Sequence, residues 1–420
     1  MKGNKAVVIS IDAMTETDFD ELLKRKNFSS LLSSYSIVRN IECVYPTYTY
    51  PCHASIISGC YPDKTGIWHN EKLDITRKRN EWNWWEKDLR AKTIIEYANE
   101  HGLTTAAVSW PVTAGGNADY TIPEIWPLEG MDADALYREA VSQKAWTIFD
   151  RNRYILDERK DRYYDIYTTV NASDIIREKS PDLTLIHLSA VDSRKHEKGS
   201  GTDVLQDAYD FIDECIGKIA SATEDSGTYP DTTFFLLGDH GQMDIKRVFS
   251  VNRVLADWGY IKLNGDRIEN WRILAHPTGF SSVVYLNGIG EEEALRVFER
   301  MKNEYPGAIE RIYSSPEAEE RWHLSGPFSI ILEGTDNTSL AFSPFLSPFT
   351  ERTDGKYSTH GYAPDKGPKP VFAVCGKRAE KNAVFDRARL VDEGPTILSL
   401  FGIEMENTDG KVIGGLLSRS

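Results

Sequence analysis

The sequence predicts an α/β protein with a mostly parallel central sheet, flanked by helices, and a small α/β cap insert. Three observations support this fold class: short β-branched runs recur along the chain, helical patterns separate them, and the texture of the sequence changes in one long segment. The chain has 420 residues, of which 40% are hydrophobic and 27% are charged. It is therefore long enough to bury a large core and to hold an inserted subdomain.

Five runs are expected as strands of the central sheet. In chain order they are KAVVISID from Lys5, TTAAVSW from Thr104, LTLIHLSAVD from Leu183, TTFFLLGDHG from Thr232 and KPVFAVCG from Lys369. Between them, AKTIIEYANEHG from Ala91 and DVLQDAYDFIDECIGKIASA from Asp203 have the pattern of helices, the second with apolar residues at spacings of three and four. This alternation indicates βαβ units and hence a parallel sheet.

The segment of residues 249–351 differs from the rest of the chain. Its runs SSVVYLNG and FSIILEG are typical of strands, and EEEALRVFERMKNEY is typical of a helix. Together they indicate a small α/β unit rather than more of the main sheet. We expect a cap subdomain at residues 249–351, inserted between the two parts of a catalytic core, residues 1–248 and 352–420.

The charge balance argues against one class of partner. The chain has 49 basic and 64 acidic residues, a net charge of −15, and its basic clusters are short. Binding of a nucleic-acid polymer needs an extended basic surface that displaces counterions. We therefore expect no nucleic-acid partner.

The cysteines and the apolar runs bear on location. Five cysteines, an odd number, follow no CxxC or zinc-finger spacing, which favours a reducing compartment. No apolar run approaches the roughly 20 residues of a membrane span, and the N-terminus lacks the apolar region of a signal peptide. We expect a cytoplasmic protein without a membrane span, and an extracellular one only if a natural leader is missing from this sequence. No oligomeric state is predicted.

Carboxylates and imidazoles gather where the predicted strands end. Ligands bind outside the carboxyl ends of strands in open parallel sheets. Three aspartates follow such strands, and three histidines stand beside or after them: Asp12, Asp192, Asp239, His196, His240 and His360. Borderline cations such as zinc prefer this set of ligands. Any one Asp after a strand is more often a helix cap or a turn residue, so spacing alone leaves a metal site and a structural role both open.

A candidate nucleophile lies in the stretch YPTYTYPCHASIISG. The run PCHASIISG predicts a short helix with Pro51 in its first turn, so Thr47 or Thr49 lies near the helix N-terminus, where an anion such as phosphate is favoured. A threonine hydroxyl is a poor nucleophile unless a divalent cation binds its oxygen. The alternative is a plain threonine cap.

The chain resembles the nucleotide pyrophosphatase/phosphodiesterase family of the alkaline phosphatase superfamily, from Val7 to about Glu404. The family nucleophile is the threonine of a PT-x-T-[FY]-P segment, which matches Thr49 and not Thr47. The resemblance implies an alkaline phosphatase-like fold. The matching pieces are VVISIDAM, YPTYTYPCHASIISGCYPDKTGIWHN, Trp110-Pro111, VDSRKH, LLGDHGQMD and HGY.

The resemblance also implies two divalent metal ions, zinc in the first place and manganese as the other choice. One site would be held by Asp12, Thr49, Asp239 and His240, and the other by Asp192, His196 and His360. Asn70 matches the residue that holds a phosphoryl oxygen together with the backbone N–H of the nucleophile. The implied mechanism is an in-line displacement that passes through a phosphothreonine.

The sequence departs from the family pattern beside the nucleophile. Cys52 replaces an asparagine, and YPDKTGI replaces YPESHGI. Further candidates for substrate contact are Lys64, which would meet an extra phosphate charge unless it is a solvated lysine, and Trp110. Three tryptophans in EWNWWEKD offer either an aromatic slot or core packing.

Three functional interpretations follow. The leading one is a metal-dependent phosphodiesterase or nucleotide pyrophosphatase that acts on a small phosphodiester or nucleotide. The nearest alternative is a phosphomonoesterase or phosphonate (C–P bond) hydrolase on the same scaffold, which needs added cationic groups. A non-catalytic binder of phospholigands is disfavoured, because every nucleophile and ligand position is filled. A sulfatase is excluded, because the segment C-x-P-x-R is absent.

Overall fold

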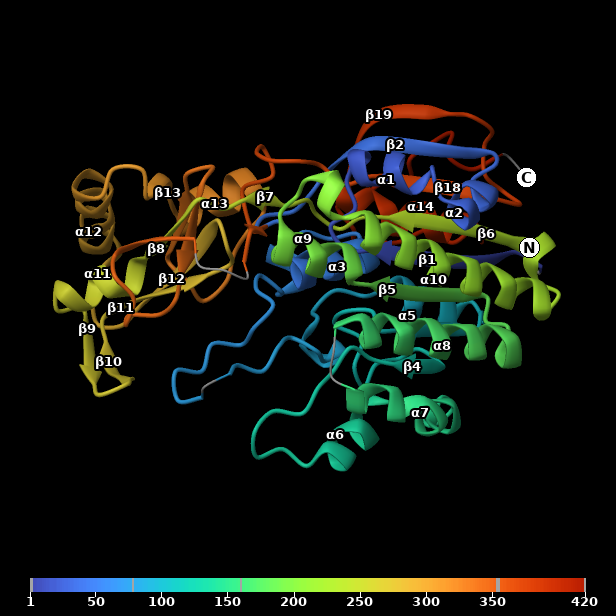
Figure 1. Ribbon diagram of the computed structural model, residues 1–420, viewed down its shortest axis with the longest axis horizontal. Coiled ribbons are helices and arrows are strands. Elements are labelled where there is room, and N and C mark those ends of the chain that lie inside the picture. Colours follow the sequence, from blue (N-terminus) through green and yellow to red (C-terminus); the bar gives the residue numbers. More distant parts are fainter. Residues whose placement is uncertain (1–2, 78, 159–160, 353–355, 419–420) are drawn as a thin grey trace.

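The computed structural model describes residues 3–77, 79–158, 161–352 and 356–418. An eight-stranded sheet forms its centre, in the order β19-β2-β18-β6-β1-β5-β3-β4 (Figure 1). The strands are β1 (Lys5–Ile11), β2 (Tyr35–Glu42), β3 (Thr105–Val108), β4 (Tyr120–Ile122), β5 (Leu183–Leu188), β6 (Thr232–Leu237), β18 (Phe372–Gly376) and β19 (Val384–Arg389).

The sheet is mostly parallel, as predicted. β1 pairs in parallel with β5 and β6, β3 with β5 and β4, and β19 with β2. β18 is the exception, because it runs antiparallel to both β2 and β6. All five predicted strand runs form strands of this sheet, so the predicted fold class is confirmed.

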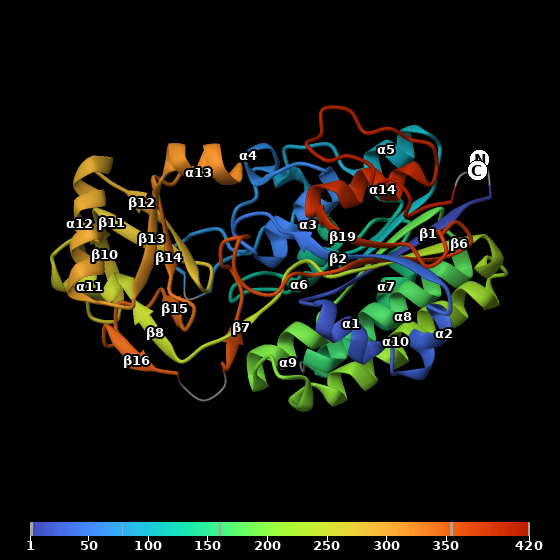
Figure 2. The ribbon, with the colours of Figure 1, turned by 90° about the horizontal axis from the view of Figure 1, so that it is seen from above.

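Helices cover both faces of the sheet (Figure 2). Successive side chains of a strand point to opposite faces. In β1, Ala6 and Val8 belong to the apolar core beneath α3, α5 and α14, whereas Val7 and Ile9 belong to the core beneath α8 and α10. The helices of this part are α1 (Glu16–Leu22), α2 (Lys26–Leu31), α3 (Thr49–Ser58), α4 (Pro62–Thr65), α5 (Ile94–Glu100), α6 (Ala133–Ala140), α7 (Trp146–Asn152), α8 (Asp161–Lys179), α9 (Ala190–Lys198), α10 (Gln206–Asp225) and α14 (Glu393–Ser399).

The segment predicted as a cap lies beside this core, at the left of Figure 1. Within the described residues its strands form separate small sheets, β10-β9, β11-β12-β14-β13 and β15-β8-β16, and none joins the eight-stranded sheet. It has its own apolar core, which includes Phe249, Phe298 and Leu332. The elements are β8 (Arg247–Ser250), β9 (Ile261–Asn264), β10 (Arg267–Trp271), β11 (Ile273–Pro277), β12 (Ser281–Leu286), β13 (Ile309–Ser314), β14 (Ile330–Gly334), β15 (Thr338–Ala341), β16 (Phe349–Glu351), α11 (Val251–Asp257), α12 (Glu291–Glu304) and α13 (Ser315–Trp322).

The chain leaves the core and returns to it at one place. β7 (Met243–Asp244) precedes the cap, β17 (Ser358–Thr359) follows it, and the two pair antiparallel. Because β7 follows His240 closely and β17 directly precedes His360, this pairing brings the two histidines together. No helix in the described ranges is both long and apolar enough to cross a bilayer.

Candidate metal centre and active site

The structure brings the six predicted ligands into two groups of three. Asp12, Asp239 and His240 form what we call the first triad, and Asp192, His196 and His360 form the second triad. Within each triad the ligand atoms all lie within 4.8 Å of one another. His360 stacks on His240 with ring centroids 4.1 Å apart, so the triads are neighbours.

The first triad lies at the carboxyl ends of β1 and β6. These strands are adjacent and parallel, so Asp12 and Asp239 emerge side by side. His240 Nε2 lies 3.2 Å from Asp239 Oδ2 and 3.5 Å from Asp12 Oδ1. Both of these carboxylate oxygens are buried and have no hydrogen-bond partner in the described part of the chain. A buried carboxylate oxygen without a partner is costly, and a divalent cation would satisfy both.

The pKa values of the two carboxyl groups in the first triad also indicate a cation site. Burial, with the charge of Asp192 added, raises the pKa of Asp12 to about 7. Burial and the charge of Asp12 raise the pKa of Asp239 to about 7 as well. Two carboxyl groups that resist ionisation together are the expected state of a cation site when no cation balances them.

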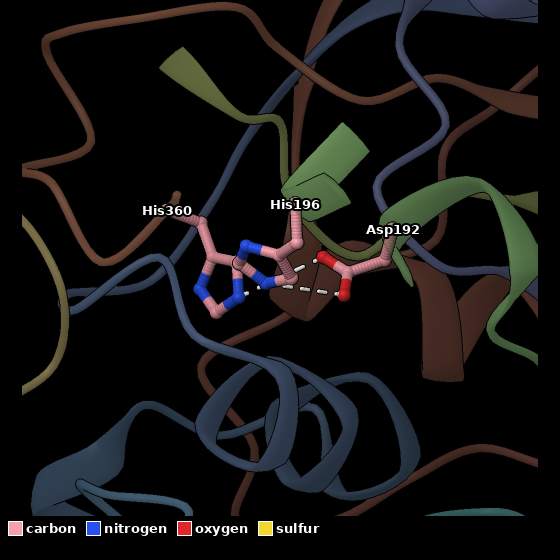
Figure 3. A group of neighbouring side chains, drawn as sticks. All are labelled: Asp192, His196 and His360. Atoms are coloured by element: carbon pink, nitrogen blue, oxygen red, sulfur yellow. Dashed lines mark ion pairs between the residues drawn. The ribbon is translucent and has the colours of Figure 1, made fainter. Parts of the chain in front are cut away.

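The second triad is built on a helix and a returning strand (Figure 3). Asp192 and His196 are four residues apart in α9 and lie on one face of it, with His196 Nε2 3.3 Å from Asp192 Oδ2. His360 Nε2 lies 3.6 Å from Asp192 Oδ1. The expectation that Asp192 directly follows a strand is wrong, because β5 ends at Leu188 and α9 begins at Ala190.

Hydrogen bonds fix the orientation of His196. Its Nδ1 lies 2.7 Å from the backbone oxygen of Ser358. A carbonyl oxygen only accepts, so Nδ1 carries the proton and Nε2 is left as the ligand atom facing Asp192.

The two threonines direct their hydroxyl groups to different partners. Thr49 is the first residue of α3, and its Oγ1 lies 3.2 Å from His240 Nε2. Thr47 Oγ1 instead donates to the backbone oxygen of Tyr362 at 2.9 Å. Pro51 stands in the first turn of α3, as predicted. Thr49 is therefore the hydroxyl that faces the first triad.

Asn70 also lies at the start of α3. Its Oδ1 accepts the backbone N–H of Tyr50 at 2.9 Å, which fixes the side chain beside Thr49. The side-chain NH₂ group then remains as the donor that could meet a bound anion.

The remaining predicted contacts lie elsewhere. The ammonium group of Lys64 forms an ion pair with Asp409, so this lysine is already paired with a carboxylate. Trp110 is completely buried and packs edge-on against His53, with ring centroids 5.0 Å apart, so it exposes no surface to a substrate. Neither residue reaches the triads through a contact within the described residues.

Of the three tryptophans in EWNWWEKD, two are core residues. Trp84 and Trp85 are buried. Trp82 packs against Tyr50 at 5.2 Å and Trp126 at 5.0 Å between ring centroids, and it is only partly buried.

Sequence reasoning missed a buried histidine beneath the first triad. His187 Nε2 lies 3.1 Å from Asp12 Oδ2, and its Nδ1 lies 3.4 Å from Glu124 Oε2. Burial opposes a charge here, but the bonds to Asp12 and Glu124 raise the pKa of His187 well above its usual value. A usable signal was present, because LTLIHL is an apolar strand with one polar residue, and its neighbour β1 ends at Asp12.

A lysine near the second triad was missed as well. The backbone N–H of Tyr357 donates to His196 O at 2.6 Å, which places the preceding residue, Lys356, beside α9. The Lys356 side chain is exposed. The negative charges of Asp192 and Glu71 act on its ammonium group. No carboxylate among the described residues pairs with it.

These observations decide the family. The family model of type I phosphodiesterase/nucleotide pyrophosphatase matches residues 6–363. The chain belongs to this family. Human ectonucleotide pyrophosphatase/phosphodiesterase family member 1 is 23% identical over 246 residues, which cover 56% of this chain and 23% of that protein. The bovine family member 3 is 24% identical over 206 residues, which cover 47% of this chain and 20% of that protein. The aligned part thus spans less than a quarter of these curated relatives.

Solved structures of the same family share the fold. Murine ectonucleotide pyrophosphatase/phosphodiesterase 5 superposes with a TM-score of 0.70 at 17% identity, over 99% of this chain and 100% of that one. The human protein of the same name gives a TM-score of 0.71 at 18% identity. The fold of this type I phosphodiesterase family member is therefore the alkaline phosphatase-like fold that the sequence resemblance implied.

Proposed function

We propose that the protein is a metal-dependent phosphodiesterase or nucleotide pyrophosphatase that acts through a phosphothreonine at Thr49. One observation carries the proposal: a threonine hydroxyl at a helix N-terminus lies 3.2 Å from His240 of the first of two adjacent triads of carboxylates and imidazoles. A small phosphodiester or nucleotide is the proposed substrate.

The donor sets suit two divalent ions. Asp12, Asp239, His240 and Thr49 would hold the first, and the second triad would hold the other. The nitrogen and oxygen donors suit zinc, with manganese as the second choice. Bound there, the ions would favour the ionised Thr49 hydroxyl, neutralise charge on the transferring phosphoryl group and activate a water molecule.

The chain's own residues supply the rest of the reaction. Thr49 Oγ1 loses its proton and attacks phosphorus, the bond from phosphorus to the leaving oxygen breaks, and a phosphothreonine forms. The NH₂ group of Asn70 and the N-terminus of α3 stabilise the charge on the phosphoryl oxygens. A water oxygen then attacks the same phosphorus, the bond to Thr49 Oγ1 breaks, and the threonine recovers a proton.

A relative supports the nucleotide class. The murine family member 5 has been solved in an inactive form in complex with AMP. That structure matches 99% of this chain with a TM-score of 0.70. We extend the inference to nucleotides as substrates here because this chain presents Thr49 beside the first of two neighbouring triads.

The second candidate is a phosphomonoesterase or phosphonate hydrolase. Lys356 favours it, since a monoester carries about two negative charges at neutral pH and needs an added cation. Lys64 does not favour it, because Asp409 already neutralises that side chain.

A substrate panel tests both candidates. The protein is loaded with zinc or manganese and offered an aryl ester of a nucleoside monophosphate, an aryl monophosphate and phosphonoacetate, and kcat/KM is measured for each. We expect the diester to be cleaved best and trapped phosphate to map to Thr49 by mass spectrometry of peptides. Preferred cleavage of the monoester or the carbon–phosphorus bond would select the second candidate, and a trapped group elsewhere would remove the proposed nucleophile.

A further inference from the structure

Gln242 connects the two triads. It lies two residues beyond His240, and its side chain is 1% exposed. Its Nε2 donates to the backbone oxygen of Asp192 at 3.1 Å and also to the carboxylate oxygen Oδ1 of the same residue. A residue that follows the first triad thus holds a ligand of the second.

The other end of the same amide reaches a second ligand. Gln242 Oε1 lies 2.5 Å from the hydroxyl oxygen of Ser358. The same hydroxyl lies 2.7 Å from the backbone oxygen of Lys195, and its single proton is donated to one of these two oxygens at a time. The backbone oxygen of Ser358 accepts the Nδ1 proton of His196. Gln242 therefore acts on Asp192 directly and on His196 through Ser358.

The orientation of the amide follows from its neighbours. Turning it over would place Gln242 Oε1 against Asp192 Oδ1, and two acceptor oxygens repel each other. With the NH₂ group on Oδ1, the other carboxylate oxygen, Oδ2, is left facing His196 Nε2 at 3.3 Å. The amide is neutral, so it orients the carboxylate without cancelling the charge that attracts a cation.

We propose that Gln242 is a positioning residue that sets the metal affinity of the second triad. The proposal rests on the proposed function in one respect, that the second triad binds a divalent ion. Hydrogen-bond partners of metal ligands typically change metal affinity by about 10–100-fold. Within the described residues, none of the side-chain hydrogen bonds of Gln242 reaches a side chain of the first triad, so the effect falls on one site.

The test measures metal binding rather than turnover. The full chain is stripped with a chelator and titrated with Zn²⁺ against a competing chromophoric chelator. The variants are Gln242→Met, which keeps the length of the side chain but removes its three hydrogen bonds, and Gln143→Met, at an exposed glutamine, which serves as the matched control. Each is repeated with His360→Ala, which leaves only the first triad complete.

The expected result is selective. Wild-type protein binds zinc in two steps, and Gln242→Met weakens by about 10–100-fold the step that His360→Ala removes. The step that remains with His360→Ala changes by less than about threefold, and Gln143→Met changes neither step. Ser358→Ala keeps the contact with Asp192 and gives a smaller loss than Gln242→Met.

Two results would overturn the proposal. One is that Gln242→Met leaves unchanged the zinc-binding step that His360→Ala removes. The other is equal weakening of both steps, which means a general loss of structure, and thermal unfolding of the metal-free variants identifies that case. A single step in the wild-type protein has a different meaning, because it refutes the proposed two-metal function itself.

Discussion

The first triad follows two adjacent parallel strands and is fully buried, whereas the second combines a helix with a segment that returns from the cap. In the first triad, the register of β1 and β6 alone places Asp12 beside Asp239. In the second, Asp192 and His196 are partly exposed, and the position of His360 depends on β17. The main sheet builds one site, and contacts between distant segments build the other.

The cap contacts the segment that carries His360. Ser281 Oγ in the cap donates to the backbone oxygen of Gly361 at 2.5 Å, and Glu333 accepts the backbone N–H of Ala363 at 3.0 Å. The carbonyl of Gly361 and the N–H of Ala363 both belong to the segment that carries His360. Changes in the cap should therefore alter the second site.

The largest effect is expected from the residue that faces the first triad. Thr49→Ala removes the proposed nucleophile, and we expect kcat to fall by at least about 1,000-fold. Thr47→Val is the matched control, since the Thr47 hydroxyl donates to the backbone oxygen of Tyr362 and not to a triad, and it should retain activity within about tenfold. Steady-state kinetics on a nucleotide aryl diester measures both. Similar losses in the two variants would contradict the assignment.

The next prediction separates the two sites by their metal. Asp239→Asn should remove the ion of the first triad, and His360→Ala the ion of the second, so each variant should bind one metal fewer than the wild-type protein. Elemental analysis of the purified proteins gives the count, and His323→Ala, an exposed histidine, is the control. Full metal content in either ligand variant would disprove that triad's role.

The comparison of the triads also explains what the sequence could predict. All six ligands and Thr49 stand in short motifs at or near strand ends, where local sequence largely fixes position, and the structure brings them together. Asp192 was placed on a strand end because the apolar run LTLIHLSAV continues into α9, and short apolar runs do not distinguish strand from helix. The reversed direction of β18 has no local signal either.

The residues that were missed depend on contacts between distant parts of the chain. Gln242 meets Asp192 across 50 residues, and His187 meets Asp12 across 175. Lys356 lies beside α9 only because β17 pairs with β7. Lys64, in contrast, is close to Thr49 in sequence, yet it pairs with Asp409 near the C-terminus. Proximity in sequence was a poor guide to the cations near the site.

A third prediction concerns the pH dependence of stability, through a buried carboxyl group in the cap. Glu333 is fully buried, its Oε2 accepts a hydrogen bond from the hydroxyl of Tyr45, and the same oxygen lies 2.6 Å from Ser281 Oγ. Burial raises its pKa from 4.5 to about 7. A carboxyl group whose pKa is higher in the folded protein than in the unfolded protein stabilises the fold at pH values below its unfolded-state pKa. That contribution is lost as the pH rises through the pKa of the folded protein.

The wild-type protein should therefore lose up to about 3 kcal/mol of stability between pH 5 and pH 8 through this one group. Glu333→Gln should flatten that part of the pH dependence, while Glu292→Gln, at an exposed position in α12, should not. Urea unfolding across this pH range measures the slopes. Parallel curves for the wild-type protein and Glu333→Gln would rule out a titrating Glu333.

The smallest expected effect concerns Lys356 and the choice of substrate. Its charge lies near Asp192 and Glu71 but forms no ion pair within the described residues, so it is free to meet a second negative charge on a phosphoryl group. Lys356→Met should lower kcat/KM for an aryl monophosphate about tenfold, which corresponds to ~1.4 kcal/mol of transition-state stabilisation. The diester carries one negative charge less, so its kcat/KM should change by less than about threefold.

Lys64→Met is the matched control and should change kcat/KM for neither substrate, because Lys64 is paired with Asp409. Equal losses of kcat/KM on both substrates would mean that Lys356 only supports the second triad. A loss confined to the diester would mean that Lys356 contacts the leaving group instead of the phosphoryl group.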